Sequence, residues 1–314
     1  MVIHHLGMRK VCRYIFIALL TLSGCSSGAR KEKLTEDDAF SFAFLTDIHL
    51  QPERGARVGF QWAIREVNKR NPDFVLTGGD MVMDALNQTY GRADSLYTLY
   101  EDLVEKFKMP VYNTMGNHEV YGWQRFEEGI EQHPEFGKLM YEQRLGPRYY
   151  SFDHKGWHFM VLDAMYLLEQ RSYTGKIDKE QMDWIIGDLK QLGRDTPIAI
   201  GVHFPFVSSA FQIGMGSTAK IPEGLVTSNS REVLALFSDY NLKLVLQGHL
   251  HFLEDLDLMG QTRFITGGAV CGQWWQTPDD APLQEGFLMI EVNGDDFTSK
   301  YVDYGWETGI SSNP

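Results

Sequence analysis

Five polar motifs, each placed directly after a short apolar run, constrain the fold of this chain more than any other feature. The apolar runs are predicted to be buried β-strands, so each motif lies where a strand passes into a loop. In open α/β sheets, sites form at the carboxyl ends of the strands, and we therefore expect the motifs to meet at one edge. In chain order they are Asp47-Ile48-His49, Gly78-Gly79-Asp80, Gly116-Asn117-His118-Glu119, His203 in Gly201-Val202-His203-Phe204-Pro205, and Gly248-His249-Leu250-His251.

The first part of the chain alternates between strand and helix patterns. Residues 40–45 form a continuous apolar run, which indicates a strand buried on both faces. Residues 58–68 have apolar side chains at helical spacing, and residues 74–76 again indicate a strand. A second helix is predicted at 95–107, before a strand that begins at residue 110. This order favours parallel strands joined by crossover helices.

The later part of the chain contains both kinds of element. Residues 172–178 are predicted to be a loop, and the Gly- and Ser-rich residues 206–227 a longer loop that is either a lid or an ordinary insertion. No linker interrupts residues 40–308, so we predict a single domain at 40–314. The apolar stripe Met182, Ile185, Ile186 and Leu189 is predicted to be core. The other predicted elements are a hairpin at 149–162, helices at 179–192 and 231–237, strands at 197–202 and 242–246, and antiparallel strands at 253–270 and 286–304.

The N-terminal residues have the composition of an export signal. Basic residues precede an apolar run at 14–22, which is too short to cross a membrane and remain there. Leu22-Ser23-Gly24-Cys25 follows and resembles the lipobox of bacterial lipoproteins. We therefore predict a signal peptide at 1–24, acylation of Cys25, a flexible tether at 25–39, and anchoring in the cell envelope, at the outer membrane or the periplasmic face. The alternative is a short buried helix.

Charge and cysteine content narrow the possible partners. The net charge is −13, and removal of residues 1–24, with three basic and no acidic residues, gives (29 − 3) − 42 = −16. Nucleic acid is therefore an unlikely partner, because its binding draws mainly on Lys and Arg contacts to phosphate. Of the three cysteines, Cys12 lies in the predicted signal and Cys25 is predicted to be acylated. The remaining Cys271 has no partner for an intramolecular disulfide, and we expect it to be a packed residue.

The residue types of the five motifs suit a transition-metal site. Asp, Asn and His offer oxygen and imidazole donors, which fit zinc, iron or manganese better than calcium. Half of the ten histidines fall in these motifs. The neighbouring glycines would let the backbone turn sharply and approach a ligand closely.

The ordered set of motifs resembles the calcineurin-like metallophosphoesterase family. This resemblance implies a four-layer α-β-β-α sandwich with mixed sheets and the site at the strand carboxyl ends. It also implies two divalent or trivalent metal ions, Mn, Fe or Zn, and a role for His118 in stabilising the phosphoryl group or protonating the leaving oxygen. The implied ligands are Asp47, His49 and His251 for one metal, Asn117, His203 and His249 for the other, and Asp80 bridging both.

One position departs from the family pattern. Many members have an Asp three residues after the bridging Asp, where it orients the catalytic histidine, but here that position is Met83. Asp84, one residue further on, is the candidate replacement. Purple acid phosphatases have a metal-binding Tyr at this position and lack the first His, so Met83 and His49 favour the branch that resembles cyclic-nucleotide and glycerophosphodiester phosphodiesterases.

The sequence therefore predicts a hydrolase of phosphodiester or phosphomonoester bonds in a small phosphorylated substrate. Two alternatives stay open: a catalytically silent surface lipoprotein that keeps structural metal, and a nuclease of the same fold. Trp274 and Trp275 either wall the substrate pocket together or divide between core and surface. The substrate, the metals and the oligomeric state are not determined by the sequence.

Overall fold

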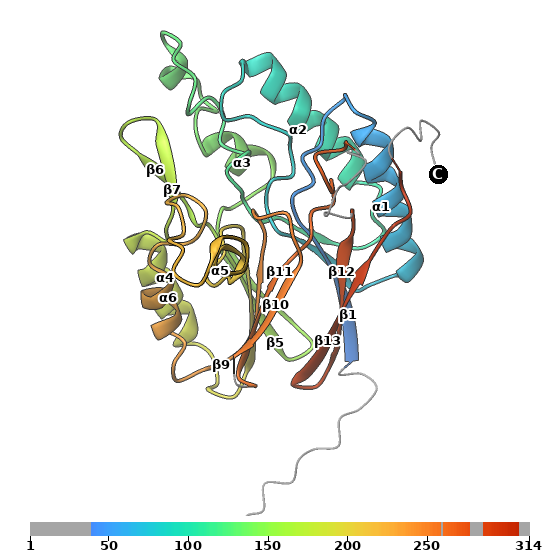
Figure 1. Cartoon of the computed structure of the whole chain (residues 1–314), viewed down its shortest axis with the longest axis vertical. Coiled ribbons are helices and arrows are strands. Elements are labelled where there is room, and N and C mark those ends of the chain that lie inside the picture. Colours follow the sequence, from blue (N-terminus) through green and yellow to red (C-terminus); the bar gives the residue numbers. More distant parts are fainter. Residues whose placement is uncertain (1–38, 259, 277–284, 308–314) are drawn as a thin grey trace, which may run out of the picture. The chain divides into compact units, whose positions relative to one another are not determined.

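The strands that precede the first three motifs belong to one mixed sheet. The computed structural model describes residues 39–258, 260–276 and 285–307, so the predicted signal peptide, Cys25 and residues 25–38 of the tether lie outside the described part. In that part the first sheet has the order β13-β12-β1-β2-β3. Strands β1, β2 and β3 are parallel to one another, and β12 is antiparallel to its neighbours β1 and β13 (Figure 1). The strands are β1 (Ala39–Leu45), β2 (Phe74–Thr77), β3 (Val111–Tyr112), β12 (Phe287–Asn293) and β13 (Asp296–Val302).

The strands before the last two motifs belong to a second mixed sheet. Its order in the described residues is β10-β11-β9-β8-β5-β4, with β11, β9, β8 and β5 parallel to one another. The outer strands β10 and β4 are antiparallel to their neighbours. The strands are β4 (Tyr150–His154), β5 (Trp157–Leu162), β8 (Pro197–Val202), β9 (Asn241–Gln247), β10 (Glu254–Leu258) and β11 (Thr262–Thr266).

The two sheets pack face to face through an aromatic core. Phe42 on β1 stacks on Phe74 on β2 with 4.9 Å between ring centroids, and Phe159 on β5 meets Phe74 edge-on at 5.2 Å. The alternate residues of β1, Ala43 and Leu45, are also buried and belong to a second core cluster. The prediction that residues 40–45 are buried on both faces is confirmed for five of the six residues, because most of the strand lies between a partner sheet and a helix layer, whereas Ser41 is half-buried.

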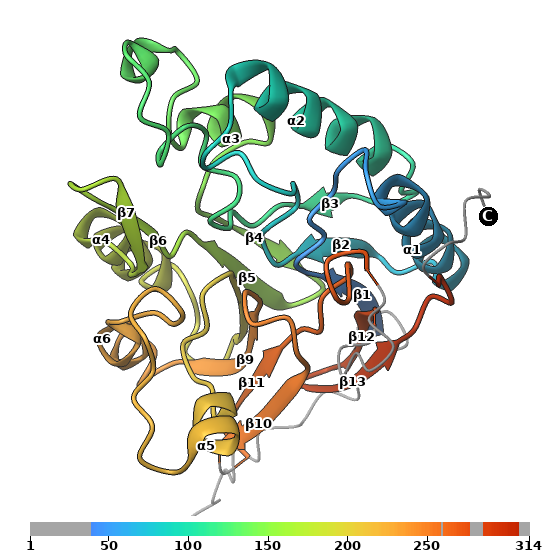
Figure 2. The same ribbon diagram turned by 45° about the horizontal axis from the view of Figure 1, so that its top comes forward.

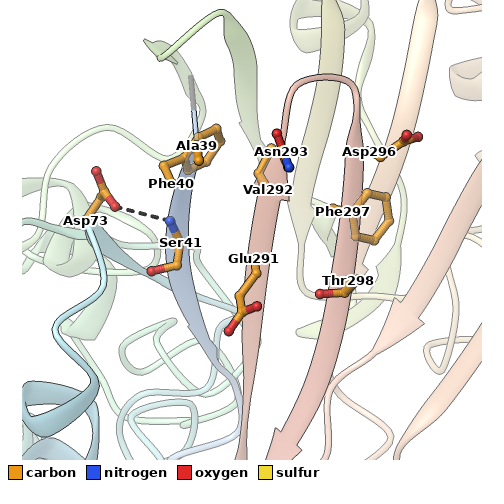
Figure 3. Close-up of a pocket in the computed structure, with 10 residues that line it drawn as sticks. All are labelled: Ala39, Phe40, Ser41, Asp73, Glu291, Val292, Asn293, Asp296, Phe297 and Thr298. Carbon is orange, nitrogen blue, oxygen red and sulfur yellow. Dashed lines mark hydrogen bonds between the residues drawn. The ribbon is translucent and has the colours of Figure 1, made fainter. Parts of the chain in front are cut away.

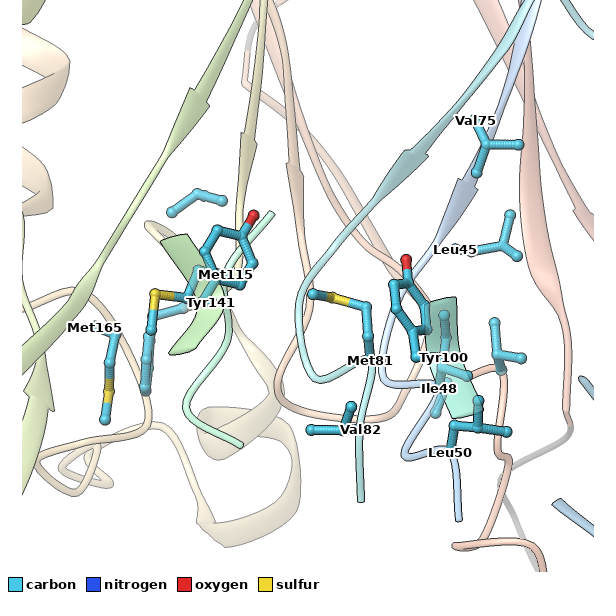
Figure 4. Close-up of a cluster of buried hydrophobic side chains, with 14 of the residues drawn as sticks. Leu45, Ile48, Leu50, Val75, Met81, Val82, Tyr100, Met115, Tyr141 and Met165 are labelled. Atoms are coloured by element: carbon cyan, nitrogen blue, oxygen red, sulfur yellow. The ribbon is translucent and has the colours of Figure 1, made fainter. Parts of the chain in front are cut away.

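Helices cover the outer faces of both sheets. Figure 2 shows α1 (Ala56–Arg70) and α2 (Tyr90–Val104) beside the first sheet, and α4 (Lys179–Leu189) and α6 (Ser230–Ala235) beside the second. Leu45 and Val75 of the first sheet share a core cluster with Tyr100 of α2 (Figure 4). This arrangement is the predicted four-layer α-β-β-α sandwich. Two short helices, α3 (Leu139–Arg144) and α5 (Ala210–Met215), lie in connecting segments, as does a 3₁₀ turn (Ile130–Gln132).

Three local predictions need correction. Residues 172–175 are not loop but β7 (Ser172–Gly175), which pairs antiparallel with β6 (Met165–Leu168). The segment 206–227 contains α5 and is not loop throughout. Ile186 on α4 is 37% exposed, so the apolar stripe of this helix is only partly core. In each case contacts with residues distant in the chain decide the local structure or its exposure, and the local sequence pattern does not contain them.

A cavity of about 540 Å³ lies at the end of the first sheet that is remote from the motifs. It is lined by the start of β1 and by the β12–β13 hairpin, including Ser41, Glu291 and Thr298 (Figure 3). The seven residues of β1 separate this end from Asp47 by roughly 23 Å at about 3.3 Å per residue. This cavity is therefore not part of the site that the motifs form.

Candidate metal centre

The five motifs meet at one edge of the sandwich, where the parallel strands of both sheets end. Backbone hydrogen bonds join the segments there. The Asp47 amide donates to the Gly79 carbonyl at 3.0 Å, and the Gly248 amide donates to the His203 carbonyl at 2.9 Å. Within the described chain, the structure thus brings together all seven predicted ligands and His118, as the distances below show.

A first group of donor atoms surrounds the imidazoles of His49 and His251. Their Nε2 atoms are 3.0 Å apart, and His251 Nε2 is 3.3 Å from Asp47 Oδ1. The Nε2 atom of His49 is 3.7 Å from Asp80 Oδ2. Ligands of a tetrahedral ion with metal–ligand bonds of about 2.0–2.2 Å lie roughly 3.3–3.5 Å apart. The separations of 3.0, 3.3 and 3.7 Å lie around this range, so these donors could surround one metal ion.

A second group surrounds Nε2 of His203. This atom is 3.2 Å from Asn117 Oδ1, 3.2 Å from Asp80 Oδ2 and 3.2 Å from His249 Nδ1. The same Asp80 oxygen therefore belongs to both groups, as expected of a bridging carboxylate. The donors fall into the two sets that the family resemblance implies.

Two contacts join a ring nitrogen to another ring nitrogen, and they test whether cations fit. His49 faces His251, and His203 faces His249. At most one nitrogen of each pair can carry a proton toward the other. Two lone pairs directed at a common point suit a shared cation, so the donor set fits metal ions.

The outward nitrogens of two of these histidines are held by backbone carbonyls. His203 Nδ1 donates to the Gly78 carbonyl at 2.7 Å, and His249 Nε2 donates to the Gly224 carbonyl at 3.1 Å. Each bond fixes the tautomer that leaves a lone pair toward the donor group. For His251 the outward Nδ1 lies 4.0 Å from the Cys271 sulfur. Cys271 is buried, as predicted for a packed residue.

The electrostatics of the site call for positive charge. Burial opposes ionisation of Asp47, but the charge and hydrogen bond of His251 and the charge of His203 together outweigh it and lower the Asp47 pKa to about 2. Burial likewise opposes charge on His251 and His203, yet Asp47 raises the His251 pKa to about 11 and Asp80 raises the His203 pKa to about 9. Two buried carboxylates therefore draw protons onto imidazoles in a place where a metal ion would supply the same charge.

Backbone strain is concentrated at the same place. Among the described residues, eleven other than glycine have positive φ, and five of them are predicted ligands. This conformation is uncommon for such residues, and it persists only where the surrounding structure enforces it. The strained ligands are Asp47, His49, Asp80, His249 and His251, with φ between 45° and 70°.

His118 lies beside the first donor group, and its orientation differs from the prediction. Its Nδ1 donates to the Met83 carbonyl oxygen, and its Nε2 is 3.9 Å from Asp80 Oδ2. The Asp84 carboxylate is 3.9 Å from His118 Nδ1, beyond hydrogen-bonding distance. It accepts instead from the Leu86 amide at 2.8 Å. The backbone of Met83 thus takes the part that the sequence suggested for the Asp84 side chain.

Glu119 supports the loops that carry the predicted ligands, a role that the sequence did not indicate. Its buried carboxylate accepts from the amides of Gly116 at 2.7 Å, Asp80 at 2.9 Å and Val82 at 3.1 Å. Burial, and then the nearby Asp80 carboxylate, raises the pKa of Glu119 to about 8. Its position at the end of the Gly116–Glu119 motif was the available signal. The side chain ties the loop after β2 to the loop after β3.

The two adjacent tryptophans divide between core and site. Trp275 is buried, and its indole N–H donates to the carbonyls of Ile48 at 2.9 Å and His49 at 3.1 Å. The Trp274 ring lies against His49, with 4.1 Å between centroids. A further aromatic residue near the site is Tyr173 on β7, whose pKa is raised by burial and then by the charges of Asp80 and Asp84.

Comparison with known proteins agrees with this fold. A model of the family described as Calcineurin-like phosphoesterase matches residues 40–253. No curated protein matches the sequence. Among solved structures, a dimetal phosphatase from Danio rerio superposes with a TM-score of 0.60 at 16% identity, covering 84% of this chain and 96% of that one. GAP50, the anchor in the inner membrane complex of Plasmodium, has a TM-score of 0.53 at 13% identity, covering 86% and 87%.

The two solved structures show the fold, and the family match goes further. It spans more than half of the 314 residues and includes every predicted ligand, from Asp47 to His251. The matched residues form two mixed sheets between helix layers, with His and Asp side chains clustered at one edge. The chain therefore belongs to the calcineurin-like phosphoesterases, a family of metal-dependent enzymes.

Proposed function

We propose that this protein is a binuclear metal-dependent hydrolase of phosphomonoester or phosphodiester bonds in a small phosphorylated substrate. The observation that carries this proposal is the pair of donor groups that share Asp80 Oδ2, one centred on His49 and His251 and the other on His203. Mn, Fe and Zn all suit these donors. When bound, the cations supply Lewis acidity, which activates water and neutralises charge on the phosphoryl group.

The proposed acid is His118. Because its Nδ1 donates to the Met83 carbonyl, its Nε2 is directed to the side of Asp80. In hydrolysis the oxygen of water bonds to phosphorus and water gives up one proton to the solvent, while the bond from phosphorus to the ester oxygen breaks with its electron pair on that oxygen. His118 Nε2 supplies the proton that this oxygen takes up. General acid catalysis of this kind contributes about 10²- to 10⁴-fold, so His118→Asn should lower kcat by that range.

The experiment is a metal-supplemented substrate panel with a ligand variant. The full chain is assayed with an aryl phosphate and an aryl phosphodiester in the presence of manganese, and bound metal is measured on the same sample. Asn117→Ala removes the oxygen 3.2 Å from His203 Nε2 and should abolish turnover. The control is Asn241→Ala. Asn241 is the first residue of β9, and its side chain donates to the Asp195 carbonyl and, among the described residues, to none of the predicted ligands. Full activity in Asn117→Ala would falsify the ligand assignment. Two bound metals without any hydrolysis would instead indicate a silent binding protein.

We also propose that the protein is exported and acts outside the cytoplasm while anchored by an acyl group on Cys25. The support is the order of basic, apolar and small residues before that cysteine. None of the helices in the described residues has the length and apolar character that a membrane span requires. Cys25→Ser should lose incorporation of labelled fatty acid and leave the membrane fraction, whereas Cys271→Ser should keep both. Equal labelling of Cys25→Ser and the unaltered chain would exclude acylation at Cys25.

A further inference from the structure

The indole of Trp274 spans the space between the first donor group and His118. Its ring centroid is 4.1 Å from that of His49 and 4.7 Å from that of His251, at interplanar angles of 42° and 32°. It is 5.9 Å from the His118 ring. The side chain is only partly buried. One tryptophan therefore covers two predicted ligands and reaches the proposed acid.

The backbone around Trp274 is held in place from several sides. Trp274 has φ of 58°, in the left-handed region, which for a bulky residue requires support from its surroundings. The next residue, Trp275, is anchored by its indole N–H to the carbonyls of Ile48 and His49. Arg54 Nη1 donates to the Trp274 carbonyl at 3.3 Å. These contacts tie the position of the ring to the segment that carries His49.

We propose that Trp274 is a specificity-determining residue that selects substrates with a planar leaving group, such as an aryl or nucleoside-like group. This inference rests on the proposed function, because it names the substrate class of the same site. A leaving oxygen that takes its proton from His118 must lie next to that side chain. The group attached to the oxygen then lies within reach of the indole, whose face favours offset stacking with another ring.

Binding of inert analogues tests the proposal without turnover. Phenylphosphonate and methylphosphonate share the phosphoryl group but differ in the planar substituent, and their affinities for the metal-loaded full chain are measured by calorimetry. The unaltered protein should bind phenylphosphonate roughly 2- to 10-fold more tightly, the range that aromatic pairs contribute. Trp274→Leu should remove this preference, and Trp274→Phe should retain most of it. Metal content should be unchanged in both variants.

Kinetics give the second measurement. The ratio of kcat/KM for phenyl phosphate to that for glycerol phosphate is compared between proteins, so that the intrinsic reactivity of each ester cancels. Trp274→Leu should lower this ratio by the same 2- to 10-fold. Trp184→Leu is the control, because Trp184 is a partly buried tryptophan on α4 that contacts Tyr149. It should leave the ratio unchanged.

The outcomes separate this proposal from the proposed function. Hydrolysis of both esters with the same ratio in the unaltered protein and in Trp274→Leu overturns the role of Trp274 and leaves the phosphoesterase intact. Equal affinity of the unaltered protein for the two phosphonates also overturns it. If no ester is hydrolysed and neither phosphonate binds the metal-loaded chain, the proposed function itself fails.

Discussion

A methyl group at position 116 is the sharpest perturbation that the structure offers. Gly116 lies between β3 and Asn117, and its amide donates to Glu119. A Cβ atom built on it would be 2.2 Å from Asp80 Oδ1 and 2.4 Å from the Asp80 amide nitrogen. Ordinary contacts begin near 3.4 Å. The backbone that carries Asp80 and the backbone that carries Asn117 must therefore separate by about 1 Å.

That separation sets the expected size of the effect. Overpacking of this kind costs about 1–3 kcal/mol of folding free energy. A displacement of 1 Å in a catalytic group lowers turnover by about 10²-fold. Gly116→Ala should therefore lower both the free energy of unfolding and kcat/KM. The loss of activity is expected because Asp80 and Asn117 belong to the same donor group. It corresponds to about 2.7 kcal/mol of activation free energy, which is at the upper end of the range expected for stability.

The assay combines urea denaturation, steady-state hydrolysis and measurement of bound metal on one preparation. The matched control is Gly187→Ala in α4, where a Cβ atom would meet nothing within 4 Å. Alanine is favoured over glycine in a helix by about 0.5–1 kcal/mol, so this control should be slightly more stable and equally active. The close-approach reasoning is refuted if Gly116→Ala keeps the metal content and the kcat/KM of the unaltered protein.

The remaining predictions concern one side chain near the site, the metals and one buried ion pair. Asp84→Asn should lower kcat/KM by less than about 10-fold, because Asp84 is 3.9 Å from His118; a loss of a thousandfold would restore Asp84 as the orienting group. Chelation should lower the melting temperature reversibly, since ligands at 100 times their Kd add about 2.7 kcal/mol per site; an unchanged melting curve would contradict this. Asp163→Ala should lower the free energy of unfolding by about 3–5 kcal/mol, because it leaves Lys138 and Arg148 without the buried carboxylate that lies 2.5 and 2.7 Å from them. A loss under 1 kcal/mol in urea denaturation would show that water replaces this carboxylate.

Short, strong sequence patterns predicted the strands and the position of the polar motifs at the strand ends, whereas the four-layer order and the division of the donors into two sets were implied by the family resemblance. A strand such as residues 40–45, in which Ser41 is the one polar residue, is almost entirely apolar only when both its faces are largely covered, and this requirement is local. The same holds for the polar residues directly after each strand. Parallel strands place their carboxyl ends at one edge of a sheet, so Asp47 and Asp80 had to lie near each other, whereas the approach of His203 depends on how the second sheet packs on the first.

What the sequence did not predict depends on partners that are distant in the chain. Residues 172–175 form a strand although their own sequence pattern is weak, because hydrogen bonds to β6 stabilise the extended conformation. The orientation of His118 by a main-chain carbonyl has no signature, since every residue carries one. The different positions of Trp274 and Trp275 likewise depend on contacts with a distant segment. The Trp275 indole donates to the Ile48 carbonyl, and the Trp274 ring packs against His49.

The donors are shared between the two sheets, and this has a consequence for assembly. Asp80 and Asn117 follow strands of the first sheet, whereas His203 and His249 follow strands of the second. A chain in which only one sheet has formed therefore presents only part of the predicted ligands. A metal ion bound by the complete set of ligands would cross-link the two sheets. Its binding energy would oppose separation of the sheets more than fraying of any single strand. Occupancy then reports that both halves of the protein have docked.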